Sequence, residues 1–191
     1  MAVTPSQMLE LGTPVPSFSL LDVVSGQTVT SQSFQHTPCV VAFICNHCPF
    51  VKHIREGLAD FGRYCQRRGV PMVAISSNDA ASYPEDAPER MVEEATQAGY
   101  VFPYLYDADQ EVAKAFRAAC TPEFYVFDRD GRLAYRGQFD DSRPSNRLPV
   151  TGADVRAAVE AVLQDRSPDV DQKPSVGCNI KWKPGHRPAW A

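Results

Sequence analysis

Six of the 191 residues are cysteines, and two of them, Cys45 and Cys48, stand only three positions apart. Two cysteines at this spacing can close a small disulfide ring. The thiolate form of a cysteine is the attacking species in disulfide exchange and in peroxide reduction. His47 lies between the two, and an imidazole that is protonated or hydrogen-bonding there lowers the pKa of a neighbouring thiol. The stretch from Cys45 to Pro49 therefore predicts a redox-active centre that forms a disulfide bond.

The pair is expected where a strand passes into a helix. Residues 39–44 form a continuous apolar run, typical of a strand that is buried on both faces. Residues 50–67 repeat apolar side chains at steps of three and four, as an amphipathic helix does. Because proline favours the first helical position, Pro49 makes Cys48 the predicted N-cap, where the positive end of the helix dipole stabilises a thiolate. We expect both cysteines to be redox-active and favour Cys48 slightly as the attacking thiolate.

The remaining patterns predict an α/β fold around a mixed sheet. Residues 14–38 contain short alternating runs that indicate an N-terminal β-hairpin, and residues 70–75 are typical of a second buried strand. A strand, a helix and a strand in this order form a right-handed parallel crossover. Two further strands, 124–127 and 133–136, are separated by a turn containing Asp-Gly, which pairs them antiparallel. The prediction is a central mixed β-sheet flanked by helices.

Two boundaries follow from the same reading. Asp86 and Glu89 have the spacing of a capping box for a helix that ends at Gly99. Beyond the last periodic helix the pattern stops, although the final segment stays apolar and aromatic. We therefore expect one domain over residues 1–166 and a C-terminal extension, residues 167–191, packed on that domain.

Composition excludes several classes of protein. Nineteen basic residues against twenty-three acidic ones give a formal net charge of −4, which offers no electrostatic footprint for nucleic acid. The longest apolar run, Cys39–Cys45, has seven residues, whereas a membrane-spanning helix needs roughly 20. The first ten residues lack the basic and apolar regions of a signal peptide. The expected location is therefore the cytoplasm, where a close cysteine pair is more often catalytic or metal-binding than structural.

Three stretches carry a family resemblance: residues 12–20, the Cys-x-x-Cys motif and residues 121–131. With them the chain resembles the thioredoxin superfamily from about residue 11 to residue 163. It is most similar to the thioredoxin-like branch that includes the alkyl hydroperoxide reductase and thiol-specific antioxidant proteins. The resemblance implies a cis-proline at Pro122 that packs against the active-site cysteines. It also implies that Thr121 offers backbone hydrogen bonds to an extended substrate segment.

The leading functional hypothesis is a thiol–disulfide oxidoreductase that works through a mixed-disulfide intermediate. Its substrate would be a disulfide-containing protein or a small thiol or peroxide, and a reducing dithiol protein would supply electrons. Neither a metal nor an organic cofactor is required. His47 resembles the central residue of the more oxidising superfamily members. The expected catalytic residues are Cys45 and Cys48, and the expected supporting residues are Asn46, His47, Pro49, Cys120, Thr121 and Pro122.

Two alternatives stay open. One is a thiol-dependent peroxidase with antioxidant activity and Cys48 as the peroxidatic cysteine, since the order Cys48-Pro49 resembles a peroxiredoxin nucleophile. Against it, Cys45 stands where those enzymes carry a threonine, and Pro122 stands about where they carry an arginine. The other, less favoured alternative is a copper chaperone of thioredoxin fold.

The other cysteines are weighed by position. Cys39 and Cys65 fall on predicted apolar faces and are expected in the core. Cys120 precedes Pro122 by two residues, so it is either a third redox partner or a small residue beside the site. Cys178 is expected to lie in a tail that Ile180 and Trp182 hold against the domain, with a functional role as the weaker alternative. A zinc site using Cys45, His47, Cys48 and His53 is disfavoured, since structural zinc usually draws on two separated ligand pairs.

Overall fold

The centre of the molecule is a seven-stranded mixed sheet, and a computed structural model describes it within residues 3–191. Its strand order is β3-β2-β6-β5-β4-β8-β9. The strands are β2 (Ser19–Asp22), β3 (Thr28–Thr30), β4 (Cys39–Phe43), β5 (Met72–Ser76), β6 (Tyr104–Tyr106), β8 (Glu123–Phe127) and β9 (Leu133–Gly137). β4, β5 and β6 run parallel, while all other neighbours pair antiparallel. The predicted mixed sheet, with its N-terminal hairpin β2–β3, is confirmed.

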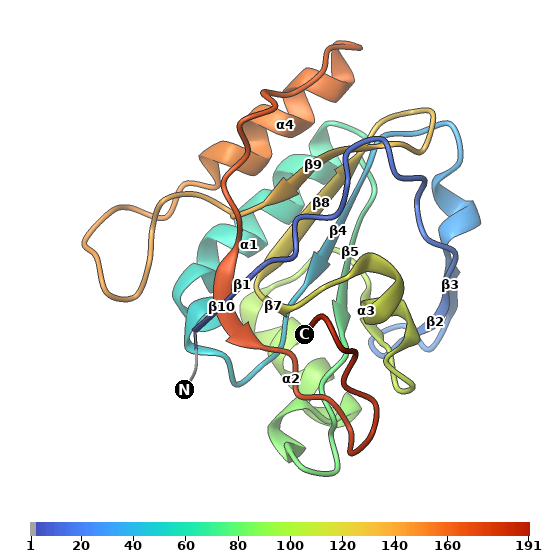
Figure 1. Cartoon of the computed structure of the whole chain (residues 1–191), viewed down its shortest axis with the longest axis vertical. Helices are drawn as coiled ribbons and strands as arrows, with labels where there is room; N and C mark the ends of the chain where they lie inside the picture. Colours follow the sequence, from blue (N-terminus) through green and yellow to red (C-terminus); the bar gives the residue numbers. More distant parts are fainter. Residues whose placement is uncertain (1–2) are drawn as a thin grey trace.

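Helices cover both faces of this sheet (Figure 1). They are α1 (Pro49–Arg67), α2 (Pro88–Ala98), α3 (Glu111–Phe116) and α4 (Ala153–Leu163), with short 3-10 turns at Ser31–Phe34 and Pro84–Asp86. Alternate residues of β4 enter different cores: Val40 and Ala42 pack with α1, α2 and α4, while Val41 and Phe43 pack with α3. The continuous apolar run of the sequence thus reflects burial on both faces. No helix within residues 3–191 is both long and apolar enough to cross a membrane.

A second, three-stranded sheet joins distant parts of the chain. Its order is β1-β10-β7, formed by β1 (Val3–Pro5), β10 (Val176–Asn179) and β7 (Cys120–Thr121). Figure 1 shows β10, in orange-red, beside the blue β1. This tail has no periodicity in the sequence, because the two central residues of β10 are both buried and no alternation results. The boundary proposed at residue 166 stays a prediction.

One predicted helix start is wrong. Asp86 and Glu89 do not form a capping box: α2 begins at Pro88 with Ala87 as its N-cap and no side-chain cap. Pro88 needs no partner for its missing N–H, so the helix starts without a polar cap. Asp86 is instead fully buried beside the cysteine loop. The other end of the helix is as predicted, because Gly99 adopts a left-handed conformation with φ 69°.

Candidate active site

The Cys-x-x-Cys motif occupies the loop between β4 and α1. Cys48 is the N-cap of α1 with extended backbone angles, and Pro49 stands at the first helical position, as the sequence predicts. The carbonyl of Cys48 accepts the N–H of Lys52 at 3.0 Å and so begins the helical hydrogen-bond pattern. Cys45 lies one turn back, in the connecting loop. The local sequence therefore places the Cys48 sulfur at the positive end of a 19-residue helix.

Both sulfurs contact Thr121 across the site. The Cys45 Sγ lies 3.4 Å from the Thr121 Oγ1, and the Cys48 thiol, when protonated, donates to the Thr121 carbonyl at 3.2 Å. The Thr121–Pro122 peptide bond is cis. Cys45 and Cys48 are 1% and 0% exposed, so neither sulfur reaches solvent in this conformation.

The two thiols have opposite acidities. The pKa of Cys48 is strongly lowered, because its thiolate accepts hydrogen bonds from the Cys178 and Cys45 thiols, which outweigh the opposing effect of burial. The pKa of Cys45 is raised by its hydrogen bond to Cys48 and by burial. These directions favour the thiolate at Cys48 and the protonated thiol at Cys45.

A buried carboxylate fixes the loop between the cysteines. The Asp86 Oδ1 accepts the backbone N–H groups of Asn46 at 2.8 Å and of His47 at 3.2 Å. Its Oδ2 accepts the Asn78 amide at 2.7 Å and lies 2.6 Å from the His47 Nδ1. The Asn46 side chain is held as well, since it accepts from the Tyr104 hydroxyl at 3.0 Å. The sequence does not reveal this role of Asp86, because the spacing between Asp86 and Glu89 also fits a helix cap.

His47 and Asp86 form an ion pair when the imidazole is protonated. The pKa of His47 is raised, first by its hydrogen bond to Asp86. Burial alone would raise the pKa of Asp86, but the hydrogen bonds from His47 and Asn78 leave it lowered. His47 also stacks on Tyr83, with ring centroids 5.4 Å apart. A positive imidazole between the cysteines favours the Cys48 thiolate.

The Cys120 thiol lies beside a buried acid. Its thiol lies 3.8 Å from the Glu123 Oε2, which also accepts the Ala119 N–H at 3.0 Å. Burial raises the pKa of Glu123 to about 7 and that of Cys120 well above its usual value. The redox role considered for Cys120 therefore stays a prediction. Nothing in the sequence singled out Glu123.

Cys178 lies against the cysteine pair. In the pairing of β10 with β7 it stands opposite Thr121, the residue that both other sulfurs contact. Its side chain is 2% exposed and belongs to the same buried cluster as Cys45 and Cys48. It hydrogen-bonds to Cys48. The only sequence signal for this placement was the apolar character of the tail.

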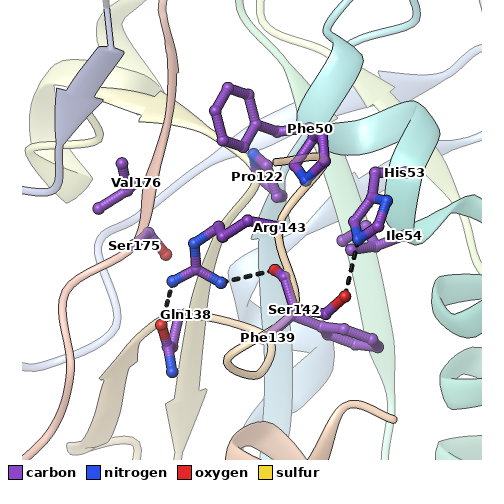
Figure 2. A pocket seen from close by; sticks show the side chains of 11 residues that line it. Phe50, His53, Ile54, Pro122, Gln138, Phe139, Ser142, Arg143, Ser175 and Val176 are labelled. Atoms are coloured by element: carbon purple, nitrogen blue, oxygen red, sulfur yellow. Dashed lines mark hydrogen bonds between the residues drawn. The ribbon is translucent and has the colours of Figure 1, made fainter. Parts of the chain in front are cut away.

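The remaining cysteines and His53 lie elsewhere. Cys39 packs in the α3 core and Cys65 in the α1 core, as expected. The His53 Nε2 is 2.7 Å from the Ser142 hydroxyl, so it does not join the cysteines as a ligand. Figure 2 shows this pair at the edge of a small pocket beside Pro122, where Phe50 and Val176 form further parts of the wall.

One set of atoms has the spacing of metal ligands. Cys45, His47 and Asp86 each bring one donor atom within 4.8 Å of the others. The Asp86 oxygens, however, already accept four hydrogen bonds, and the raised pKa of Cys45 opposes the thiolate form that a metal needs. These residues fit a copper or zinc ion poorly, and the copper-chaperone alternative stays a prediction.

Comparison with known proteins identifies the family. The model described as AhpC/TSA family matches residues 11–136, which is more than half of the chain. The chain belongs to the AhpC/TSA family. Membership in this family, which contains redoxins, supports oxidoreductase chemistry in general. No curated protein matches the chain.

Solved structures place this AhpC/TSA member in the thioredoxin fold. An uncharacterized conserved protein from Geobacillus kaustophilus shares 52% identity with a TM-score of 0.94, over 97% of this chain and 98% of that one. A hypothetical protein from Sinorhizobium meliloti shares 51% identity with a TM-score of 0.92, over 95% and 100%. A thioredoxin-family thiol:disulfide interchange protein from Chlorobium tepidum, 21% identical, has a TM-score of 0.62 over 80% and 97%. At that identity the last similarity shows the fold alone.

Proposed function

We propose that this AhpC/TSA family member is a thiol–disulfide oxidoreductase in which Cys48 attacks and Cys45 resolves. The observation that supports this most is the environment of Cys48. Its sulfur sits at the N-terminus of α1 and accepts hydrogen bonds from two neighbouring thiols, which favours a thiolate. Thiol- or disulfide-containing substrates suit this chemistry.

The reaction proceeds in two exchanges. The Cys48 thiolate attacks one sulfur of a substrate disulfide, so a Cys48–substrate mixed disulfide forms and the other substrate sulfur leaves as a thiolate. Cys45 then gives up its proton and attacks Cys48. The Cys45–Cys48 disulfide forms, and the second substrate thiol leaves. The protein loses two electrons and the substrate gains them. A dithiol protein would then reduce the Cys45–Cys48 disulfide and restore both thiols.

Neighbouring residues hold this geometry. Asp86 fixes the backbone of Asn46 and His47, so the loop presents Cys45 toward Cys48. Pro49 starts α1 directly after Cys48. Thr121 contacts both sulfurs and is joined to Pro122 by a cis peptide bond.

A disulfide with a coloured aromatic leaving group tests the assignment of the attacking cysteine. The Cys45→Ser variant should still release the coloured thiol, because Cys48 remains. The Cys48→Ser variant should release it about a hundredfold more slowly, since a thiol with a raised pKa is mostly protonated. The assignment is wrong if Cys45 alone supports the rapid release. Cys65→Ser serves as the control, since Cys65 is buried in the α1 core.

A thiol peroxidase is the second candidate, favoured by the AhpC/TSA match and by the order Cys48-Pro49 at the helix start. In that reaction the Cys48 thiolate would attack a hydroperoxide, giving a sulfenic acid and an alcohol or water. Cys45 would then condense with the sulfenic acid, releasing water and forming the disulfide. Hydrogen peroxide consumption with a dithiol reductant decides between the two. Turnover that exceeds disulfide exchange at equal substrate concentration would reverse the order proposed here.

The cytoplasmic location expected from the sequence is part of the same proposal. A reducing compartment would keep Cys45 and Cys48 as thiols between turnovers. Thiol trapping in intact cells, followed by mass spectrometry, would report the redox state of the pair.

A further inference from the structure

A third sulfur lies next to the attacking cysteine. The Cys48 sulfur is hydrogen-bonded to Cys45, its neighbour in the motif, and to Cys178, which comes from β10. The three side chains share one buried cluster, and each is at most 2% exposed. Cys48 is therefore the central sulfur, with one thiol available to it from the loop and one from the strand.

The position of Cys178 is set by tight backbone packing. Opposite Thr121, β10 runs so close to β7 that a Cβ added to Gly177 would lie 2.0 Å from the Thr121 carbonyl oxygen. Only glycine allows this approach. Real Cβ atoms essentially never come so near another atom. The neighbouring residue, Cys178, is thereby held opposite Thr121, which the Cys45 and Cys48 sulfurs both contact.

Hydrogen bonds hold the strand on both sides of Cys178. Before it, the Ser175 carbonyl accepts the Ser6 N–H at 2.9 Å. After it, the Ile180 N–H donates to the Ala119 carbonyl at 3.1 Å, and the Lys181 N–H donates to the Asn78 side chain at 2.8 Å. In the folded state these hydrogen bonds hold β10 at the site, so the Cys178 sulfur does not have to be brought from a distance.

We propose that Cys178 is a third redox cysteine of this site, which forms a disulfide with Cys48 in competition with Cys45. This inference rests on the proposed function, because it needs Cys48 as the reacting sulfur. The exchange is balanced without an external oxidant. The Cys178 thiolate attacks Cys48 in the Cys45–Cys48 disulfide, the Cys178–Cys48 bond forms, and Cys45 leaves as a thiolate that takes up the proton from Cys178.

The same step resolves a mixed disulfide. When a substrate sulfur is bonded to Cys48, attack by Cys178 on Cys48 releases the substrate thiol and forms the Cys48–Cys178 disulfide. The product links β10 covalently to the start of α1. It differs in this from the Cys45–Cys48 disulfide, which closes only the loop between β4 and α1.

Variants that lack Cys45 isolate this reaction. The full-length Cys45→Ser protein is treated with an aromatic disulfide, and the released thiol is counted. Two thiols per chain and a Cys48–Cys178 linkage in peptide mapping are expected, because Cys178 completes the second exchange. The Cys45→Ser/Cys178→Ser variant should release one thiol and keep the mixed disulfide for at least about ten times longer. Cys45→Ser/Cys65→Ser is the matched control and should behave like Cys45→Ser.

The outcomes separate the two proposals. If both variants retain the mixed disulfide equally long, Cys178 is not a redox partner and this inference is wrong, while the proposed function stands. If the variant lacking Cys45 and Cys178 releases no thiol and forms no adduct, Cys48 is not the attacking sulfur and the proposed function fails with it. Cys45→Ala is run in parallel, so that a folding defect caused by serine at a buried position does not decide the result.

Discussion

Asp86 is the residue on which the shape of the cysteine loop depends. Its carboxylate is completely buried and accepts hydrogen bonds from two consecutive backbone amides of the motif. A buried carboxylate is costly unless every oxygen is paired, and here four donors satisfy it. The loop geometry and the charge of His47 are therefore coupled through one side chain.

Replacing Asp86 by asparagine tests this coupling. The raised pKa of His47 should fall in Asp86→Asn, because the hydrogen bond to the carboxylate is its first cause. In the wild type this interaction stabilises the fold below the unfolded pKa of 6.5, and the stabilisation is lost as the pH rises through the raised value. We expect Asp86→Asn to lose about 1–3 kcal/mol of unfolding free energy below pH 6.5. NMR titration of the imidazole checks the pKa, with the exposed neighbour Glu85→Gln as control. An unchanged His47 pKa would contradict the assigned pairing.

Glu123 predicts a second pH dependence, of opposite origin. Burial raises the pKa of its carboxyl from 4.5 to about 7, so the folded state favours the protonated form. The contribution of Glu123 to the free energy of unfolding is then greatest below pH 4.5. It falls by about 3 kcal/mol in total as the pH rises to about 7. The Glu123→Gln variant should lose this dependence. Urea unfolding of both proteins under reducing conditions, at pH 5 and pH 8, measures it; parallel profiles would refute the shift.

At the residue scale the sequence predicted the motif and its neighbours Thr121 and Pro122, but not the roles of Asp86 and Cys178. Cys45, Cys48 and Pro49 were readable because a local pattern, an apolar run followed by a helical period, places them. Asp86 and Cys178 reach the site through long-range packing, and their local patterns pointed elsewhere. No spacing rule connects residue 48 to residue 178.

At the scale of elements, β10 acts as a strap over the cysteine pair. It pairs with β7 on one side and with β1 on the other. Cys48 is 0% exposed and contacts Cys178 of β10, so a reagent needs part of its cover to move before it can react. We expect local opening of β10 to limit access to the site.

Gly177→Ala should loosen the strap. The added methyl group would collide with the Thr121 carbonyl, which costs about 1–3 kcal/mol and separates β10 from β7. Since 1.4 kcal/mol corresponds to a factor of ten, we expect Cys48 to be alkylated about ten times faster. The matched control is Gly26→Ala, at a hairpin turn with φ 72° and no atom within 4 Å of the added Cβ. Equal acceleration in both variants would indicate global unfolding instead of strap opening.

The order of elements was largely predictable, with the strap as the exception. Hairpin, central strands and long helices carry the periodicities that burial imposes on one or two faces. β1 is only three residues long and β10 shows no alternation, so only their pairing with each other and with β7 makes them strands. Such pairing is a tertiary property.

For the whole molecule, the redox state should change stability. The Cys48 thiolate accepts hydrogen bonds from two thiols, and a Cys45–Cys48 disulfide would remove them. Because the Cys45–Cys48 disulfide closes a short loop, its constraint on the unfolded chain stabilises the oxidised protein by only about 2 kcal/mol. Each hydrogen bond to a charged group contributes about 1.5–3 kcal/mol, so the reduced form should be the more stable. By linkage, the pair should then be a stronger oxidant in the folded protein than in the unfolded chain.

Urea unfolding with and without a dithiol reductant measures the difference. The midpoint should be higher for the reduced protein, and the gap should disappear in Cys48→Ser, which can form neither the thiolate nor the Cys45–Cys48 disulfide. A higher midpoint for the oxidised protein would mean that the thiolate is not stabilised as described.

The β1-β10-β7 sheet also fixes the order in which the molecule can be completed. Val3 pairs with Cys178, so β1 has no partner in this sheet until residues 176–179 have been made. Cys45 and Cys48 precede those residues in the chain by more than a hundred positions. We therefore expect a newly made molecule to pass through a stage in which these two sulfurs are open to the surrounding thiol pool, until β10 pairs and closes the site.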